Sequence, residues 1–515
     1  MPNPRHTREI RHGAAVPYFL SAASGVLFAL AFPDYGFAWL AFLSLAPLLI
    51  AIVRASSWRE AFLQGWLAMS VAWLMMVPWV VRVMSHYGGL PYITGVLIFC
   101  AMSAFLGLYG GIFALIVWSL RLRARFAPWL LIAPAWAAVE FARTYLLTGF
   151  PWNLIGTAIV DYTPLIQMSR AAGPYFLGCL VVLPSILIAW LVTQRPRGIG
   201  RAIVVGATVI VLFVWWATGY VASQWRRMDS NAPIQTAALL QPNISQEMRW
   251  NVANVITLFQ RMMAMTNEAA NHGVNVIIWP ESTVPLSFAS TEFFRNAIES
   301  TSATRNVDII LGSVAEDPSQ PNRMWNAAFL VSGGRTIGHY DKIRLVPFGE
   351  YVPMRKMLFF AEKLVHAVGE FEFGTKDHPL RGRFAYGPAI CYEVVFPRIT
   401  ATQVKNGADV LVTITNDAWY DGTSAPRQHL NQVRLRAVEA DRWVLRAGTT
   451  GISAVIDPTG RIVQEIPMGR EGIIYAKFAA RSSVTPYVRY GDWFAWGCVI
   501  AVMIAIVVRR RTKTS

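Results

Sequence analysis

The sequence predicts a polytopic α-helical membrane domain joined to an α/β domain in which helices cover two sheets. Three observations predict this fold class: eight long apolar runs, a stretch over residues 226–490 that has no such run, and an alternation of short strands with helices inside that stretch. Of 515 residues, 54% are hydrophobic and 15% are charged, whereas a soluble globular chain carries roughly 25% charged residues. The composition therefore excludes a disordered chain and argues against an ordinary soluble enzyme.

The apolar runs predict membrane-spanning helices, because a span requires roughly 17–25 mostly apolar residues. We expect a membrane domain of seven helices over residues 1–225, and an eighth helix with a basic tail over 491–515. The first run is expected to stay in the protein, because no convincing signal-peptidase site precedes Asp34. Six runs are long and free of charge, and the other two, 127–139 and 493–508, are shorter and give a weaker signal. In chain order the runs cover 13–33, 35–53, 61–81, 92–120, 127–139, 171–194, 202–225 and 493–508.

The net charge of +16 is a topology signal. When the loops are assigned alternately to two sides, one side receives both tails and three loops, with 15 basic residues against two acidic ones. Cytoplasmic loops carry such an excess of Lys and Arg. Both termini are therefore predicted to be cytoplasmic, with residues 226–490 on the outer side, and the charge gives no reason to expect nucleic-acid binding.

Short apolar runs bounded by turn residues predict the strands of the outer domain. Gly333-Gly334 and Pro458-Thr459-Gly460 predict the turns of two hairpins. Helices are expected over 246–272, 292–304 and 427–442, outside two sheets. The expected strands cover 274–279, 307–314, 326–332, 336–340, 385–390, 408–415, 452–457, 461–466 and 472–478.

A carboxylate, an amine and a thiol stand where predicted strands end. Glu281 follows the strand 274–279, Lys342 follows the strand ending at Tyr340, and Cys391 follows the strand ending at Ile390. Open α/β sheets place their chemistry at strand ends. These groups suffice for acyl transfer: the carboxylate takes the thiol proton, the thiolate attacks a carbonyl, and the ammonium stabilises the oxyanion beside the backbone N–H that follows the cysteine.

Each of the three residues also has a structural interpretation. Glu281 could cap the following helix, Lys342 could be a surface charge beside Asp341, and Cys391 could be a small buried hydrophobic residue. The sequence contains no GxGxxG, phosphate-binding loop, HExxH or CxxC motif. Nucleotide and zinc sites therefore have no support, and we expect neither a cofactor nor a metal.

Four sequence strings stand in order along residues 226–490: IIWPES at 277–282, YDKIRLVPFGEYVP at 340–353, AICYEVVFP at 389–397 and TNDAWYDGTSAPRQHL at 415–430. These strings resemble the nitrilase superfamily, whose active site is a Glu–Lys–Cys triad. With the flanking apolar runs, the whole chain is similar to the apolipoprotein N-acyltransferase family. The resemblance implies a nitrilase-like αββα sandwich over 226–490, with Glu281 as general base, Lys342 as oxyanion stabiliser and Cys391 as nucleophile.

The resemblance also implies supporting residues. Glu350 matches a second acidic residue that the family requires, and Tyr392 and Glu393 match required positions directly after the nucleophile. Trp250 matches a functional tryptophan through the less regular segment EMRW. From the residues alone, Glu350 could instead pair with Arg344, and the two aromatic residues could belong to the core or to the membrane interface.

The resemblance further implies a two-step reaction. Cys391 would take the sn-1 acyl chain of a phospholipid, typically phosphatidylethanolamine, as a thioester. The N-terminal amine of the S-diacylglyceryl-cysteine of an apolipoprotein would then accept that chain and give the mature triacylated lipoprotein. The implied location is the bacterial cytoplasmic (inner) membrane, with the catalytic domain in the periplasm, and nothing in the sequence requires more than a monomer.

Residues 354–368 follow the string GEYVP and carry an apolar helical stripe, which Phe359 and Phe360 widen. We interpret this segment as a lid that dips into the bilayer surface and admits acyl chains. The alternative is a helix that packs on the core of the outer domain.

Two pairs are interpreted as structural. Glu140 and Arg143 are spaced i,i+3 near a span end and are expected to form an ion pair. Asn416 and Asp417 are expected to hold a loop through side-chain to backbone hydrogen bonds.

Two other functions remain open from sequence. A membrane-tethered amidase would use the same triad and resolve the thioester with water, although eight spans rather than one anchor argue against it. A transporter or receptor would use the outer domain only for binding and would survive Cys391→Ala. The apolar runs of this chain lack the charged or Gly/Pro-broken helix pairs expected of ion-coupled transport, which argues against a transporter.

Overall fold

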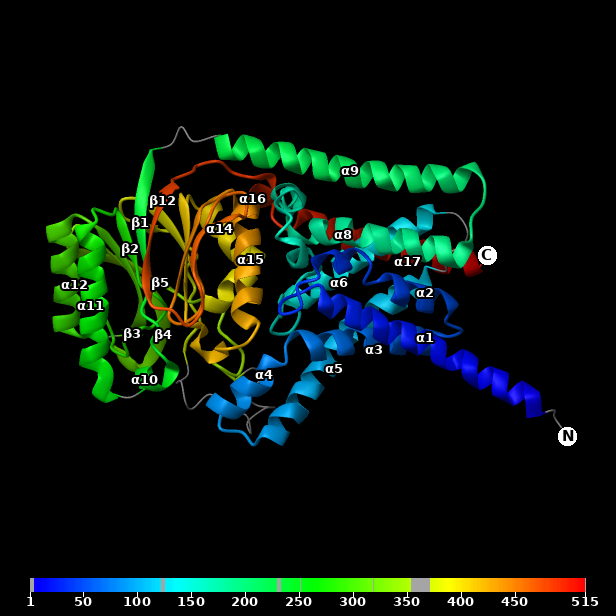
Figure 1. Ribbon diagram of the computed structural model, residues 1–515, viewed down its shortest axis with the longest axis horizontal. Helices are drawn as coiled ribbons and strands as arrows, with labels where there is room; N and C mark the ends of the chain where they lie inside the picture. The colour runs from blue at the N-terminus through cyan, green and yellow to red at the C-terminus, as the bar shows by residue number, and fades with distance from the viewer. Residues whose placement is uncertain are drawn as a thin grey trace. The chain divides into compact units, whose positions relative to one another are not determined.

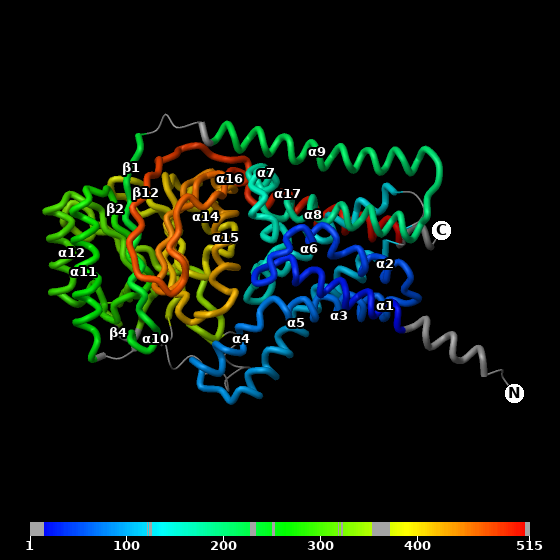
Figure 2. Tube along the Cα trace, in the orientation of Figure 1, coloured from blue at the N-terminus to red at the C-terminus, as the bar shows by residue number. Residues whose placement is uncertain are grey.

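The computed structural model (Figures 1 and 2) comprises two compact units. One unit contains Met1–Ser85, Leu90–Val221 and Asp492–Ser515, and the other contains His86–Gly89 and Ala222–Gly491. The structure describes residues 4–120, 122, 126–228, 233–250, 252–317, 319–352 and 371–514.

Helices occupy all eight apolar runs of the sequence. Three of the described helices, α5, α8 and α9, are long and apolar enough to cross a membrane, and α3 with the helical segment up to Tyr87 makes a fourth if this pair, bent by 57°, is one span. Shorter apolar helices cover Ala15–Leu30, Ala38–Arg54 and Trp493–Arg509. The count of eight spans remains a prediction. The main helices are α1 (Pro4–Leu30), α2 (Ala46–Arg54), α3 (Trp58–Met76), α5 (Tyr92–Ser119), α6 (Ile132–Tyr145), α8 (Ser169–Gln194), α9 (Ile199–Met228) and α17 (Trp493–Thr514).

Small residues let α3 and α5 pack closely. A Cβ placed on Gly65 would lie 2.2 Å from the carbonyl oxygen of Gly110, and a Cβ on Gly107 would lie 2.1 Å from the hydroxyl of Ser70. Apolar helices in a membrane associate through such close contacts, because burial away from lipid gives no hydrophobic gain. Larger side chains at these glycines would force the helices apart.

The expected pair of Glu140 and Arg143 on α6 is confirmed, with Nη2 of Arg143 4.0 Å from Oε1 of Glu140. The carboxylate also accepts a hydrogen bond of 2.7 Å from the backbone N–H of Ile155. Arg143 donates to the carbonyl oxygens of Phe150 and Trp152 at 2.7 and 2.8 Å. The pair therefore fixes the chain that follows α6.

Two six-stranded sheets form the second unit, in the orders β12-β1-β2-β3-β4-β5 and β11-β10-β9-β8-β7-β6. Each sheet has three parallel strands, β1–β2–β3 in one and β7–β8–β9 in the other, with antiparallel strands on both sides. The strands are β1 (Ile234–Gln241), β2 (Val276–Ile278), β3 (Asp308–Asp317), β4 (Gln320–Ser332), β5 (Arg335–Asp341), β6 (Leu380–Arg381), β7 (Ala385–Ile390), β8 (Val410–Thr415), β9 (Val444–Gly448), β10 (Ser453–Ile456), β11 (Ile462–Ile466) and β12 (Gly472–Ala479).

Helices cover the outer face of each sheet, which confirms the predicted αββα sandwich (Figure 1). The pair α11 (Val255–Asn271) and α12 (Glu292–Arg305) packs on the first sheet, and α14 (Pro397–Lys405) and α15 (Ala425–Ala440) pack on the second. In β1, Ala237 and Leu239 face the second sheet, whereas Leu240 faces the helices. Strands buried on both faces are apolar throughout.

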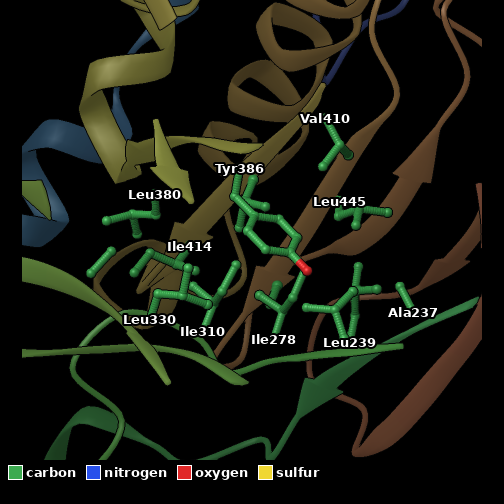
Figure 3. Packing of buried hydrophobic residues seen from close by; sticks show 14 of the residues in the cluster. Ala237, Leu239, Ile278, Ile310, Leu330, Leu380, Tyr386, Val410, Ile414 and Leu445 are labelled. Atoms are coloured by element: carbon green, nitrogen blue, oxygen red, sulfur yellow. The ribbon is translucent and has the colours of Figure 1, made fainter. Parts of the chain in front are cut away.

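The core between the sheets is a single apolar cluster (Figure 3). Leu239, Ile278 and Ile310 of the first sheet meet Val410 and Leu445 of the second. Polar contacts also cross this layer: for example, the hydroxyl of Tyr386 donates a hydrogen bond of 2.8 Å to the Asp308 carboxylate. These contacts hold the two sheets in one packing arrangement, and that arrangement determines which strand ends meet.

Both predicted hairpins are confirmed, β4–β5 around Gly333-Gly334 and β10–β11 around Pro458-Thr459-Gly460. The predicted helix over 246–272 is wrong in extent: a short helix, α10 (Gln246–Trp250), precedes a 3₁₀ turn and α11. Strands β1, β6 and β9 and helix α14 were not expected from the sequence.

Candidate active site

The three residues singled out from the sequence all follow strands. Glu281 lies three residues after the end of β2, Lys342 follows β5 directly, and Cys391 follows β7 directly. Strands β2 and β5 belong to the first sheet and β7 to the second. The site is thus built where the ends of strands from both sheets come together.

Both oxygens of the Glu281 carboxylate accept hydrogen bonds. Oε1 accepts from Lys342 Nζ at 3.1 Å and from Asn326 Nδ2 at 2.7 Å, and Oε2 accepts from the backbone N–H of Asn416 at 2.8 Å. Burial alone would raise the pKa of Glu281, but the charge of Lys342 and these hydrogen bonds outweigh it and hold the pKa below its usual value. Glu281 is therefore an ionised, buried carboxylate rather than the cap of α12, which begins only at Glu292.

Lys342 is buried between two carboxylates, which excludes the surface-charge interpretation. Its Nζ lies 3.1 Å from Oε1 of Glu281 and 2.9 Å from Oε1 of Glu350, and only 1% of the side chain is exposed. Burial lowers the pKa of Lys342, but the charges of Glu281 and Glu350 outweigh that effect and raise it well above its ordinary value. The ammonium is therefore a permanent buried positive charge.

Glu350 pairs with Lys342, so its predicted alternative partner Arg344 is wrong. Oε1 of Glu350 also accepts from Asn326 Nδ2 at 2.8 Å, and Oε2 accepts from the backbone N–H of Val346 at 2.8 Å. The guanidinium of Arg344 instead lies 5.3 Å from the centre of the Phe396 ring. Glu350 therefore balances the charge of Lys342 and ties the loop after β5 to it.

Cys391 stands at a sharp turn between β7 and a 3₁₀ helix over Cys391–Val395. Its φ of 50° lies in the left-handed region, which costs a non-glycine residue about 1–3 kcal/mol and is common at functional sites. Burial, followed by the charge of Glu281, raises the pKa of the thiol, against the opposing charge of Lys342. The resting group is a neutral thiol within electrostatic reach of both residues.

Glu393 ties the turn at Cys391 to the loop that carries Lys342. Oε1 accepts from the Tyr340 hydroxyl at 2.9 Å and from the backbone N–H of Ile343 at 2.5 Å, and Oε2 accepts from the backbone N–H of Ile390 at 2.7 Å. Burial raises the pKa of Glu393 to about 7, against the hydrogen bond from Ile390 and the charge of Lys342. Glu393 is a positioning residue that fixes Lys342 relative to Cys391.

Of the remaining candidates from the sequence, the structure describes the side chain of only one, Tyr392. Tyr392 is buried next to Cys391 in the chain and packs edge-on against Phe396, with ring centres 5.2 Å apart. Trp250 ends α10, and its side chain lies outside the described residues. Phe359 and Phe360 lie in 353–370, also outside the described residues, so the lid remains a prediction.

Two asparagines in the site were not assigned this role from the sequence. Nδ2 of Asn326, on β4, donates to both Glu281 and Glu350. The backbone N–H of Asn416 holds the other oxygen of Glu281, while its Oδ1 accepts a hydrogen bond of 3.4 Å from the N–H of Ala418 as the loop interpretation predicts. No local sequence signal identifies either residue, because their contacts depend on how distant strands pair.

A buried network behind Cys391 was also missed. Nε2 of His429, on α15, lies 3.0 Å from the carbonyl oxygen of Cys391. Nδ1 lies 3.2 Å from Oδ1 of Asp417 and 3.1 Å from Nη2 of Arg446, which also bridges to Oδ2 of Asp417 at 2.7 Å. Burial and the charge of Arg446 lower the pKa of His429. The neutral ring is thus assigned as donating from Nε2 to Cys391 and accepting from Arg446 at Nδ1.

No group of three or more His, Cys, Asp or Glu that could hold a metal ion occurs in the described part of the chain. The groups that are present can perform acyl transfer. An ionised carboxylate can take the proton of a thiol, and an ammonium between two carboxylates can stabilise an oxyanion.

Two family models match the chain. The model described as carbon-nitrogen hydrolase matches residues 236–487, and the model described as apolipoprotein N-acyltransferase N-terminal domain matches residues 24–187. The sandwich and its strand-end site thus define a carbon–nitrogen hydrolase domain of the nitrilase superfamily. A crystal structure of an amidase from Nesterenkonia sp. is 20% identical, covers 48% of this chain and 91% of its own, and superposes with a TM-score of 0.37.

Relatives match over nearly the whole chain. An apolipoprotein N-acyltransferase of Geobacter metallireducens is 33% identical over 507 residues, which cover 96% of each chain. Another from Methylococcus capsulatus is 33% identical over 513 residues, with 96% of this chain and 97% of that protein covered. The chain belongs to the apolipoprotein N-acyltransferase family.

Proposed function

We propose that this protein transfers the sn-1 acyl chain of a phospholipid to the N-terminal amine of the S-diacylglyceryl-cysteine of apolipoproteins. The family relation supports N-acylation of lipoproteins in general. The finer proposal rests on one observation: Cys391, Glu281 and Lys342 are all buried at strand ends, and Lys342 Nζ lies 3.1 Å from Oε1 of Glu281.

In the first half-reaction, Glu281 takes the proton of the Cys391 thiol as the sulfur attacks the ester carbonyl of the phospholipid. Because the pKa of Cys391 is raised, the thiolate does not accumulate and proton removal accompanies attack. The Lys342 ammonium stabilises the oxyanion of the tetrahedral intermediate. The ester C–O bond then breaks, the lysophospholipid alcohol leaves with the proton from Glu281, and an acyl thioester remains.

In the second half-reaction, the neutral amine of the diacylglyceryl-cysteine attacks the thioester carbonyl. Glu281 accepts a proton from the attacking nitrogen, the C–S bond breaks, and the proton returns to Cys391. The products are an amide and the free enzyme. An ester is exchanged for an amide, so the reaction needs no nucleotide.

Both half-reactions require that water is kept from the thioester. Cys391, Glu281 and Lys342 are all buried, with exposed fractions of 8%, 6% and 1%. If water entered freely, the same groups would release free fatty acid and act as a lipase. Burial of the triad therefore supports transfer over hydrolysis.

The direct test follows the acyl chain to its acceptor. Purified full-length protein is incubated with phosphatidylethanolamine labelled in its sn-1 chain and a synthetic S-diacylglyceryl-cysteine peptide, and the peptide is analysed by mass spectrometry. We expect the label in an amide at the peptide N-terminus, and no transfer with Cys391→Ala. Labelled free fatty acid without acylated peptide would overturn the proposal and favour the amidase-like hydrolase.

A further inference from the structure

Two buried hydrogen-bond donors on one face of α10 have no partner among the described residues. Nε of Arg249 and Nε2 of Gln246 are both shielded from solvent and unpaired. The two residues are spaced i,i+3, so their side chains lie on the same side of the helix. Buried donors without partners are costly, and a buried guanidinium without an acceptor is especially costly.

Hydrogen bonds connect this pair of donors to the catalytic base. Oε1 of Gln246 accepts a hydrogen bond of 3.0 Å from Asn416 Nδ2, which orients the Gln246 amide and leaves its Nε2 as a donor. The backbone N–H of Asn416 in turn donates to Glu281 at 2.8 Å. Burial lowers the pKa of Arg249, and the charge of Glu281 opposes this shift, so the guanidinium lies within electrostatic reach of the carboxylate.

The chemistry of the pair selects an anion. A guanidinium and an amide NH₂ present only donors here, and Arg is the side chain best suited to phosphate oxygens. Glu281 is not the missing partner, because neither donor makes a hydrogen bond to it. A ligand with acceptor oxygens and negative charge would satisfy both donors.

We propose that Arg249 and Gln246 form a subsite that binds the phosphodiester group of the acyl donor beside the triad. The inference rests on the proposed phospholipid donor and deepens it. In a phospholipid, only the glycerol backbone separates the phosphate from the sn-1 ester carbonyl. Holding the phosphate at α10 would therefore place that carbonyl near Cys391 and would select phosphate-bearing lipids over neutral esters.

The first test compares two donors that share the same sn-1 ester. Single-turnover acylation of full-length protein in detergent is followed by intact mass with phosphatidylethanolamine and with 1,2-diacylglycerol, which lacks the phosphate. We expect Arg249→Gln to raise the half-saturating phosphatidylethanolamine concentration about tenfold or more, because a charge-assisted contact is lost. The diacylglycerol dependence should change less than about twofold. Arg249→Lys, which keeps the charge without the planar fork, should lie between.

Two further variants sharpen the comparison. Gln246→Glu keeps the shape of the side chain and its contact with Asn416, but it replaces the amide donor with a negative charge. This variant should therefore weaken the binding of phosphatidylethanolamine more than the binding of diacylglycerol. Arg261→Gln, on α11, removes a surface ion pair with Glu471 and is the matched control. Its half-saturating concentrations of phosphatidylethanolamine and of diacylglycerol should both stay unchanged. Equal effects of Arg249→Gln on both donors, or no effect on either, would overturn the inference.

A competition arm identifies the source of the phosphate. Inorganic phosphate and glycerophosphoethanolamine are tested as inhibitors of diacylglycerol-driven acylation. If both compounds inhibit and Arg249→Gln abolishes the inhibition, the subsite binds phosphate in general. If only glycerophosphoethanolamine inhibits, the subsite recognises the lipid headgroup. Inhibition by neither contradicts the subsite. If the wild-type protein forms no acyl-enzyme with either lipid, the proposed function itself has failed.

Discussion

The triad is a network in which each charge sets the protonation state of the next. Lys342 holds Glu281 ionised, and Glu281 with Glu350 holds Lys342 charged. The thiol of Cys391 stays protonated because burial and Glu281 outweigh the effect of Lys342. The network thus stores a proton on sulfur and the acceptor for it on the carboxylate.

Lys342→Met tests this coupling through pH. In the wild-type protein Lys342 lowers the pKa of Glu281; without it, burial dominates and that pKa rises. Since only ionised Glu281 can accept the thiol proton, the acid limb of the acylation rate should move to higher pH. The rate at its optimum should also fall by about a hundredfold or more, because the oxyanion loses its cation. Single-turnover acylation across pH measures both effects, and an unchanged acid limb would contradict the coupling.

Glu350→Gln and Arg344→Gln separate the two partners considered for Glu350. The first variant places an amide where Lys342 and Asn326 both donate, so acylation should slow by about tenfold or more. Arg344→Gln keeps the backbone contact with Glu393 and should change the rate less than about threefold. If Arg344→Gln slowed acylation more than Glu350→Gln in the same assay, the result would favour Arg344 as the partner of Glu350.

The strand-end positions of Glu281, Lys342 and Cys391 were predictable from the sequence, because the strands before them are visible in it. Apolar runs end directly before or near Glu281, Lys342 and Cys391, and the structure confirms these strands. The donors that orient Glu281 were not predictable. One is a backbone N–H at Asn416 and the other is the lone amide of Asn326. Neither has a local sequence pattern, because both depend on the register of distant strands.

At the scale of elements, Cys391 stands on a strained turn that is held from behind. This left-handed residue follows β7 directly, and His429 on α15 binds its carbonyl oxygen. Arg446 on β9 and Asp417 after β8 fix the histidine ring. Helix α15, strand β9 and the loop after β8 therefore hold the turn at Cys391 together.

His429→Ala should loosen this turn without removing any group that touches substrate. We expect kcat of acyl transfer to fall by about tenfold or more, with KM for the phospholipid changed less than about twofold. His429→Gln, which retains a side-chain N–H, should recover part of the loss. His272→Ala, at the exposed end of α11, is the matched control. A dominant change in KM would show that His429 acts on substrate binding instead.

Elements with local turn signals were predicted best. Gly333-Gly334 and Pro458-Thr459-Gly460 identified two hairpins because their backbone preferences are local. Strand β1 was missed because its sequence, IQTAALLQ, is buried on both faces over its second half and is poor in β-branched residues. Strand β9 was missed because it carries Arg446, a buried charge whose partner Asp417 lies on another loop.

At the scale of the whole molecule, the chain combines apolar helices with a carbon–nitrogen hydrolase domain, as the family does. The amino-acid composition predicted this combination, because a soluble hydrolase does not need the long apolar runs that this sequence contains. The number of spans and the sidedness depend on the bilayer, which the fold alone does not include. The helices found on all eight runs leave the predicted topology open to direct test.

Cysteine labelling tests that topology. We expect Arg470→Cys, in an exposed turn of the outer domain, to react with a membrane-impermeant maleimide in bacterial cells whose outer membrane has been made permeable. Arg197→Cys, in the basic loop between the sixth and seventh runs, should react only after the inner membrane is disrupted. The parent protein is the control for background labelling by its own cysteines, of which Cys100 is exposed and Cys179, Cys391 and Cys498 are buried. Labelling of Arg197→Cys before disruption would contradict both the topology and the periplasmic site.

The central claim is that Cys391 carries the acyl chain, and intact mass tests it most directly. Detergent-purified wild-type protein and Cys391→Ser are incubated with phosphatidylethanolamine alone, with no acceptor. The account predicts a fatty-acyl mass on the wild-type protein that hydroxylamine removes, with release of lysophospholipid, and no such labile adduct on Cys391→Ser. A wild-type protein that gains no acyl mass and releases no lysophospholipid would contradict it.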